Sequence, residues 1–320
     1  MGQLVEGQWR EERVDTTEVD GRFVRSQTRF RGKIEDCDDA EFPSEAGRYH
    51  LYVSHACPWA HRTLLMRRLK RLDDVISVSV VDPYMGPEGW SFSDREGCGP
   101  DEVNGARYLH EIYTRADPRF TGRVTVPVLW DKRKGTIVSN ESADIIRLFN
   151  DAFPRFTKGT PDLYPDALRP EIERWNGRIY PAVNDGVYRT GFASTQAAYE
   201  DSFRTLFQAL AELDEHLASR RFLCGATLTE ADIRLWTTLV RFDAVYLTHF
   251  KCNERRLTEF PHLWDYTRDL YQWPGVKETV FLDHIKEHYF LSHPTLNPKG
   301  IVPLGPRVDL DAPHRRHELI

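Results

Sequence analysis

The chain has 320 residues, 40% of them hydrophobic and 29% charged, with a formal net charge of −6, which predicts two globular domains or one with a long extension. Its lysines and arginines are dispersed, which excludes a basic nucleic-acid-binding face, and no apolar run approaches the roughly 20 residues of a membrane span. The first residues lack the pattern of a secretory signal, and the five scattered cysteines form neither a disulfide framework nor a metal-ligand spacing, so we expect a reducing, cytoplasmic compartment.

Residues 1–45 are polar and charged, and we expect them to form an extension that packs over a core rather than forming one. The apolar run at 49–53 then predicts a buried strand. A short turn leads into a helix that starts near Pro58 and carries leucines on its apolar face. The β-branched run at 75–81 predicts a second strand.

A segment rich in Gly, Pro and Asp follows from 82 to 123, and an insertion of this length is usually functional or disordered. It contains one short predicted helix near 103–115. Two apolar runs at 124–131 and 136–138 predict an antiparallel hairpin, and a helix opens within 139–149. The order strand, helix, strand, insertion, strand, strand, helix is that of an α/β thioredoxin-like domain.

From about residue 165 the apolar pattern has a helical period. One predicted core face consists of Ile172, Trp175, Ile179, Tyr180 and Val183. The stretch 229–232 begins with Thr and ends with Asp, which predicts a capping box at a helix start. We therefore expect a thioredoxin-like domain at 46–155, an all-α helical bundle at 165–295 and a C-terminal tail at 296–320.

Cys57 is the residue whose chemistry is most clearly indicated. It comes at or just before a helix start, because Pro58 is tolerated in the first helical turn. The N–H groups and the dipole at such an end favour a thiolate and lower the pKa of a cysteine. Position 60 is Ala60, so Cys57 has no local disulfide partner and needs an external thiol, most simply glutathione. The alternative is a buried structural cysteine.

Pro127 interrupts an otherwise clear predicted strand, where it would remove a hydrogen bond of the sheet. A cis Val126–Pro127 bond explains it, because such a bond would turn the Val126 backbone outward beside Cys57. Backbone groups presented in this way can pair with an extended peptide. The alternative is a simple edge-strand proline.

Glu141 and Ser142 follow Asn140 at a helix start, which is a ready anion-binding site. Ser142 and the N–H groups could hold the carboxylate of an amino acid, and Glu141 its ammonium group. Plain capping by Ser139 or Asn140 is the alternative. In combination with Cys57 and the Val-Pro pair, ligand binding is the better interpretation.

Together these motifs resemble the cytosolic glutathione transferase superfamily and, within it, the xi-class glutathionyl-hydroquinone reductases. The resemblance covers nearly the whole chain and is carried by residues 56–62, 89–92, 122–132, 139–142, 188–193 and 288–290. It implies the cytosolic glutathione transferase fold, a homodimer, and glutathione as co-substrate. The sequence offers no motif for a metal, flavin or nicotinamide, and its composition predicts no membrane or nucleic-acid partner.

The resemblance also implies roles for individual residues. Cys57 would be the nucleophile, and Tyr188 and Tyr289 would hydrogen-bond the hydroxyls of an aromatic substrate. Glutathione would be held by Trp90, Arg123, Val126, Glu141 and Ser142. Packing is the alternative for Trp90 and for each tyrosine, and Tyr199 is a weaker candidate for a wall of the aromatic pocket.

The implied reaction is glutathione-dependent reductive deglutathionylation of S-glutathionyl-hydroquinones through a Cys57–glutathione mixed disulfide. Two alternatives stay open. The first is an omega-like thiol transferase or dehydroascorbate reductase with the same Cys57 chemistry. The second is a non-catalytic, glutathione-transferase-like binding module, which need not retain a reactive thiol.

Overall fold

The computed structural model describes residues 2–11 and 20–319, and these form two compact units. Unit 1 contains Ser26–Pro161, Leu291–His293 and the described residues before position 16. Unit 2 contains Asp162–Phe290 and the described residues of 16–25 and 294–320. Residues 1, 12–19 and 320, which belong to the expected N-terminal extension and C-terminal tail, lie outside the described residues.

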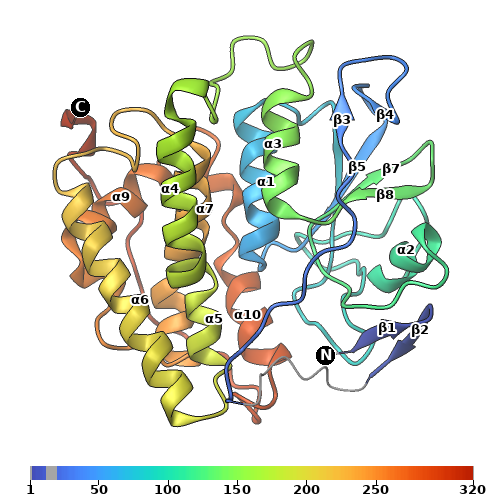
Figure 1. The fold of residues 1–320 in the computed structure, drawn as a ribbon. Helices are drawn as coiled ribbons and strands as arrows, with labels where there is room; N and C mark the ends of the chain where they lie inside the picture. The colour runs from blue at the N-terminus through green and yellow to red at the C-terminus, as the bar shows by residue number, and fades with distance from the viewer. Residues whose placement is uncertain (1, 12–19, 320) are drawn as a thin grey trace. The chain divides into compact units, whose positions relative to one another are not determined.

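Unit 1 is built around a mixed four-stranded sheet with the strand order β6-β5-β7-β8. Its elements are β1 (Gln3–Val5), β2 (Gln8–Arg10), β3 (Ile34–Glu35), β4 (Phe42–Pro43), β5 (Tyr49–Val53), α1 (Pro58–Leu69), β6 (Ser77–Val80), α2 (Leu109–Ala116), β7 (Val128–Asp131), β8 (Thr136–Ser139) and α3 (Ser142–Asp151). β5 pairs parallel with β6 and antiparallel with β7, and β7 and β8 form the expected hairpin. Helices α1 and α3 lie side by side against the sheet, with α2 beyond its other side (Figure 1). This arrangement confirms the thioredoxin-like prediction.

Of the expected extension, residues 2–11 and 26–45 belong to unit 1, where they form strands that the sequence pattern did not predict. β1 and β2 make an antiparallel hairpin, and β3 pairs parallel with β4. Leu4 is fully buried, and its backbone exchanges hydrogen bonds of 3.0 and 2.9 Å with Gly122 of the insertion. The hairpin is therefore attached to the end of the insertion that precedes the Val-Pro pair.

The helix expected near 103–115 is shorter at its start, because α2 begins only at Leu109. The buried Asp101 carboxylate accepts hydrogen bonds from the backbone N–H groups of Val103, Asn104 and Ala106. These bonds hold the chain in a turn, and Gly105 adopts a positive φ of 65° within it. A side chain that captures backbone donors in this way competes with helix formation.

The strand expected from 124 begins at Val128, so Pro127 lies just before β7 and not inside it. The Val126–Pro127 peptide bond is cis, as predicted. The preceding residue, Thr125, is held by Tyr113, whose hydroxyl donates to the Thr125 carbonyl oxygen at 2.8 Å. The missing N–H of Pro127 therefore removes no hydrogen bond from the sheet.

Unit 2 is helical throughout its regular structure, which confirms the predicted helical half. Its helices are α4 (Arg169–Ile179), α5 (Gly186–Gly191), α6 (Gln196–Leu217), α7 (Glu230–Leu239), α8 (Leu247–His249), α9 (Pro261–Tyr271) and α10 (Leu282–Ser292, whose last two residues belong to unit 1). Two π-helical turns, η2 (Tyr180–Asn184) and η3 (Phe242–Tyr246), precede α5 and α8, and four 3₁₀ turns are η1 (Asp166–Leu168), η4 (Leu257–Glu259), η5 (Lys277–Thr279) and η6 (Arg316–Glu318).

Two sequence predictions in unit 2 have different outcomes. The capping box at α7 is confirmed, because the Thr229 backbone N–H and hydroxyl both donate to the Asp232 carboxylate at 2.9 Å. The prediction that Tyr180 belongs to the core was wrong, since its side chain is 41% exposed. Tyr180 is the C-cap of α4 and directly follows the buried Ile179, so its side chain points about 100° around the helix from the buried face.

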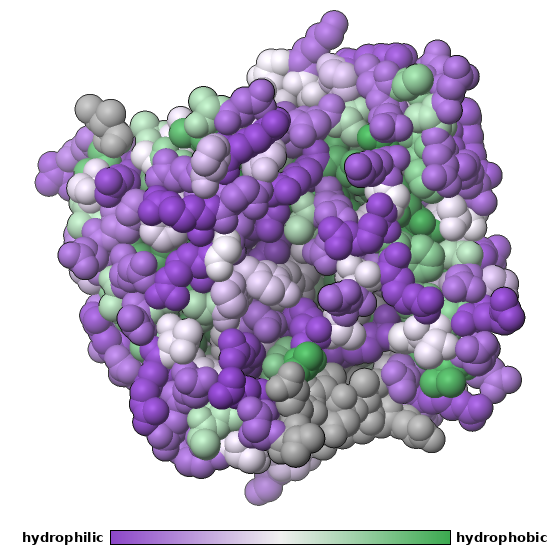
Figure 2. Space-filling view, in the orientation of Figure 1, coloured by the Kyte–Doolittle hydropathy of each residue, from purple (hydrophilic) through white to green (hydrophobic). Residues whose placement is uncertain are grey.

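The face of the molecule in Figure 2 is dominated by hydrophilic residues, with hydrophobic ones scattered among them. Scattered apolar side chains are ordinary on a protein surface. Among residues 2–11 and 20–319, no helix combines the length and the apolar character that crossing a membrane requires.

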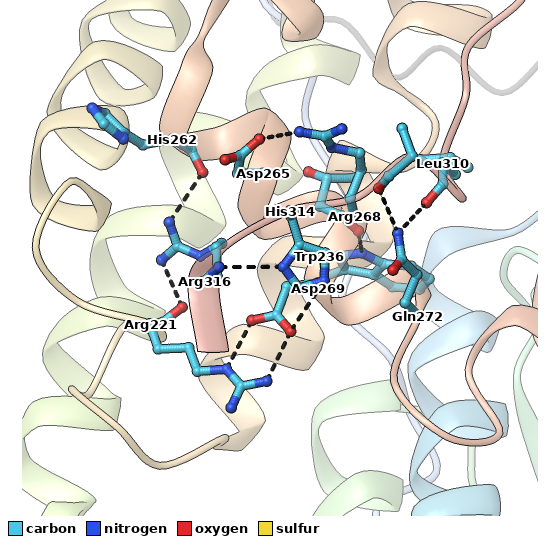
Figure 3. A network of polar contacts seen from close by, with 12 residues as sticks. Arg221, Trp236, His262, Asp265, Arg268, Asp269, Gln272, Leu310, His314 and Arg316 are labelled. Carbon is cyan, nitrogen blue, oxygen red and sulfur yellow. Dashed lines mark hydrogen bonds and ion pairs between the residues drawn. The ribbon is translucent and has the colours of Figure 1, made fainter. Parts of the chain in front are cut away.

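The C-terminal tail is fastened to unit 2 by Arg316, whose side chain is buried (Figure 3). Its guanidinium donates to the carbonyl oxygens of Leu217 at 3.0 Å, Arg221 at 2.7 Å, and Arg220. A helix end leaves carbonyl groups without partners inside the helix, and α6 ends at Leu217. Arg316 therefore caps this end, beside the bidentate pair of Arg221 with Asp269.

We predict that Arg316→Met, which keeps much of the side-chain volume, lowers the free energy of unfolding by about 2 kcal/mol, because buried carbonyl oxygens lose their donors. Urea denaturation followed by circular dichroism measures it. Arg315→Met is the matched control, because Arg315 is 83% exposed and pairs with Glu318 on the surface. Equal stability of the two variants would contradict the capping role.

Candidate active site

Cys57 occupies the N-cap position of α1, directly after the turn that follows β5. Its backbone is extended, with φ −76° and ψ 121°, and Pro58 takes the first helical position. The Cys57 carbonyl accepts the N–H of His61 at 2.9 Å, which starts the helical hydrogen bonding. The predicted strand-turn-helix placement is confirmed, so the half-buried thiol lies at the positive end of a helix dipole.

The cis turn at Val126 lies against this thiol. The Cys57 Sγ atom is 3.7 Å from the Val126 carbonyl oxygen, close enough for a weak S–H donor. Tyr113 supports the turn, because its hydroxyl donates to the Thr125 carbonyl oxygen and accepts a hydrogen bond from the Asn140 side-chain amide at 3.2 Å. Cys57 and the Val126 backbone therefore lie beside each other, as the sequence predicted.

Glu141 and Ser142 stand at the start of α3, but the cap differs from the one expected. Glu141 itself is the N-cap, and its Oε1 accepts the N–H of Ala143 at 3.0 Å. Ser139 bonds the Glu141 N–H instead of capping the helix. Thr28 of the extension donates to Glu141 Oε2 at 3.1 Å, a contact that the sequence pattern did not reveal. The carboxylate is thus fixed in place at a helix N-terminus.

Trp90 and Arg123 come from the insertion. Trp90 is 6% exposed, and its carbonyl accepts the N–H of Leu109 at 2.9 Å, which ties it to the start of α2. The preceding Gly89 has φ 76°, and a side chain there would meet the ring of Trp9. Arg123 follows Gly122, the residue bonded to Leu4. The N-terminal hairpin therefore braces the backbone beside both predicted glutathione contacts.

Tyr188 on α5 and Tyr289 on α10 are brought together in unit 2. Their hydroxyl oxygens are 2.5 Å apart, and the hydroxyl of Tyr246 lies 3.0 Å from that of Tyr289. Burial raises the pKa of Tyr289 well above its ordinary value, so this phenol stays protonated at neutral pH. The sequence pattern did not indicate Tyr246 as a member of this cluster, because Tyr246 continues an apolar helical pattern that is typical of core residues.

Gly191 allows this cluster to pack closely. A side chain at Gly191 would collide with the Phe250 ring, and that ring lies 5.4 Å from the Tyr188 ring and 5.6 Å from the Tyr289 ring, between centroids. Tyr199, the weaker candidate, lies on α6 and donates to the Lys251 carbonyl at 2.9 Å.

Among the residues that the structure describes, no group of three or more His, Cys, Asp or Glu residues is arranged to hold a metal ion.

Comparison with known proteins identifies relatives over nearly the whole length. Family models of the glutathione S-transferase N-terminal and C-terminal domains match residues 56–152 and 196–269. The glutathionyl-hydroquinone reductase YqjG of Escherichia coli is 52% identical, with 99% of this chain and 98% of the relative covered. The glutathionyl-hydroquinone reductase PcpF of Sphingobium chlorophenolicum is 52% identical, with 96% of each chain covered.

Solved structures agree with these matches. A xi-class glutathione transferase from Natrialba magadii has 52% identity and a TM-score of 0.93, with 100% of this chain and 97% of that chain covered. The glutathione-bound structure of YqjG has 49% identity and a TM-score of 0.90, with 99% of both chains covered.

We predict that iodoacetamide at pH 7 alkylates Cys57 more than about tenfold faster than Cys224 or Cys252, because thiolate is the reactive form. Burial raises the pKa of the Cys224 thiol to about 12 and raises that of Cys252 as well. Peptide mapping by mass spectrometry measures the rates, with Cys57→Ser as the control that removes the fast site. Labelling of Cys224 at the rate of Cys57 would contradict the prediction.

Proposed function

The chain belongs to the glutathionyl-hydroquinone reductases of the xi class of glutathione transferases, and we propose that it reduces S-glutathionyl-hydroquinones with Cys57 as the nucleophile. One observation carries the assignment of the nucleophile. Cys57 caps the N-terminus of α1, and its sulfur faces the Val126 carbonyl oxygen beside the cis proline. A thiol there is poised for thiol transfer, whereas a serine or tyrosine hydroxyl would favour conjugation.

Glutathione is both part of the substrate and the reductant. We assign Val126 to the backbone of its cysteinyl part, and Glu141 with Ser142 to its γ-glutamyl end. This assignment is supported by the fixed Glu141 carboxylate and by the N–H groups at the start of α3. Trp90 and Arg123 are assigned to further glutathione contacts from the insertion.

The reaction has two steps. In the first, the Cys57 thiolate attacks the sulfur of the glutathionyl group, an S–S bond forms and the aryl carbon–sulfur bond breaks. The aryl group keeps the electron pair of that bond, takes up a proton and leaves as hydroquinone. In the second, a glutathione thiolate attacks the mixed disulfide, releases oxidised glutathione and restores the Cys57 thiolate. Two thiols supply both electrons, so the scheme needs no metal, flavin or nicotinamide.

Tyr188 and Tyr289 are assigned to the hydroxyls of the aromatic ring. Breaking the carbon–sulfur bond requires the ring to accept electrons and a proton. Phenol donors near the ring hydroxyls assist this step by general acid and electrostatic catalysis. The raised pKa of Tyr289 supports the role, because a donor must keep its proton at the working pH.

We further infer a homodimer in the cytoplasm, where glutathione keeps thiols reduced. The homodimer rests on membership of the superfamily, and light scattering of the purified protein tests it.

An omega-like thiol transferase or dehydroascorbate reductase is the second candidate, because a Cys-Pro pair at a helix start serves that chemistry equally well. The third, a binding module without catalysis, is disfavoured by the placement of Cys57, since a module that only binds does not need a thiol at a helix N-terminus.

We predict that Cys57→Ala lowers the rate of hydroquinone release by at least about 1,000-fold, because the nucleophile is lost. The assay uses glutathionyl-menadiol with glutathione, and chromatography follows hydroquinone and oxidised glutathione, which form in a 1:1 ratio. Cys37→Ala is the control, because Cys37 is exposed in the extension. Hydroquinone release that survives in Cys57→Ala would exclude this nucleophile.

We predict that Tyr188→Phe and Tyr289→Phe each lower hydroquinone release about 100-fold, because each removes a donor to the substrate. Reduction of the mixed disulfide of glutathione and 2-mercaptoethanol should change less than about threefold, since it needs Cys57 without an aromatic site. Steady-state kinetics on both substrates gives the comparison. Equal losses on both, or no loss on either, would favour the omega-like candidate.

A further inference from the structure

A short segment of the N-terminal region, residues 20–25, belongs to unit 2 and not to unit 1. Its backbone is tied to the loop between α5 and α6, because the Ser194 N–H donates to the Gly21 carbonyl at 3.0 Å and the hydroxyl of Thr195, the N-cap of α6, donates to the Asp20 carbonyl at 2.9 Å. Phe23 is buried and its ring lies 5.5 Å from the Phe192 ring, between centroids. The segment is therefore held against the helix that carries Tyr188.

Arg25, at the end of this segment, contacts Tyr188 directly. The centre of its guanidinium lies 4.8 Å from the centroid of the Tyr188 ring, within the range of a cation–π interaction. Its Nε donates to Asp185 Oδ1 at 2.8 Å. Asp185 lies three residues before Tyr188, so it is on the same side of the chain, one helical turn earlier. The guanidinium is thus fixed between a carboxylate and the phenol ring.

The electrostatics favour the cation in this place. Burial lowers the pKa of Arg25, but Asp185 and Tyr188 raise it, and the net shift is upward. The interaction is mutual, so a cation that is stabilised by negative charge on Tyr188 stabilises that charge in return. Arg25 therefore makes the Tyr188 phenol a better proton donor as well as holding its ring.

Other titratable or charged groups also surround the two hydroxyls and their cation. Among the described residues, Asp185 and Tyr180 act on Arg25, and Tyr246 and Arg241 act on Tyr289. The rings of His249 and His288 also lie 6.3 and 5.3 Å from the Tyr289 ring, between centroids. Arg25 differs from these groups in lying directly over the face of the Tyr188 ring.

We propose that Arg25 is a positioning residue for hydroquinone release, orienting Tyr188 and stabilising the negative charge that develops when its phenol donates. This inference rests on the proposed function, because it concerns the step in which Tyr188 contacts the aromatic ring. It makes residues 20–25, which lie far from Tyr188 in sequence, part of the apparatus that handles the substrate.

The test compares Arg25→Gln, Arg25→Lys and the control Arg22→Gln. Arg22 comes from the same segment but is 47% exposed and pairs with Asp20 and Asp201. We expect Arg25→Gln to lower kcat for hydroquinone release about tenfold, Arg25→Lys to recover part of the loss, and Arg22→Gln to change nothing. The alkaline limb of the kcat profile should move to higher pH in Arg25→Gln, because loss of the cation raises the pKa of Tyr188.

A double-mutant cycle with Tyr188→Phe separates positioning from a general structural role. If Arg25 acts through Tyr188, Arg25→Gln lowers kcat for hydroquinone release only slightly when Tyr188 is already replaced by Phe. An equal loss in both backgrounds, or wild-type kcat and pH profile in Arg25→Gln, overturns the proposal. If Arg25→Gln does not fold, Arg25→Lys is measured in both backgrounds by the same criteria.

The wild-type protein tests the underlying function independently. Cys57-dependent hydroquinone release by the wild type must be present before any variant is compared, and its absence would refute the proposed function itself. Reduction of the small mixed disulfide serves as an internal reference, because we expect it to stay unchanged in Arg25→Gln.

Discussion

The antiparallel pairing of β5 with β7 is the interaction on which the thiol site depends. The register places Tyr52 opposite Val128, so the end of β5 lies beside the start of β7. The turn after β5 carries Cys57, and the residues before β7 carry the cis Val126–Pro127 bond. A slip of one residue would exchange the two faces of the strand, and because every residue of β5 and β7 is buried, side chains such as Leu51 and Leu129 would face the wrong packing layer. Hydrophobic burial thereby sets the position of a reactive sulfur.

The N-terminal region contributes to both units by bracing residues that carry the proposed chemistry. In unit 1, Leu4 bonds Gly122 beside Arg123, and Thr28 donates to the Glu141 carboxylate. In unit 2, Arg25 holds the ring of Tyr188. Each contact fixes a side chain or its backbone through a group that does not itself need to touch the substrate. Such support reduces the freedom of a site before the substrate arrives, which is how precise geometry is maintained.

Unit 2 also shows how a helical core accommodates buried polar groups. The Asp232 carboxylate is fully buried and accepts hydrogen bonds from Thr229, the Leu223 N–H and the Tyr266 hydroxyl. Burial raises the pKa of this carboxyl group, and the hydrogen bonds lower it. Whereas Asp232 accepts hydrogen bonds, the buried Arg316 guanidinium donates them to carbonyl oxygens at the end of α6. Both side chains satisfy backbone groups at helix ends, so their burial keeps the helices in place.

The sequence by itself determined the thioredoxin-like order of elements, the helical second half, the capping box at Thr229 and the placement of Cys57, because these depend on local periodicity and on single residues such as Pro58. It misplaced the starts of α2 and β7, where Asp101 captures the backbone N–H groups of the residues just after it and Tyr113 bonds the Thr125 carbonyl. Only the tertiary structure decided that Tyr188 and Tyr289, 101 residues apart, share a hydrogen bond with Tyr246 nearby, and that Arg25 lies over Tyr188. Buried aromatic residues look alike in a sequence pattern, and packing alone selects which hydroxyls meet.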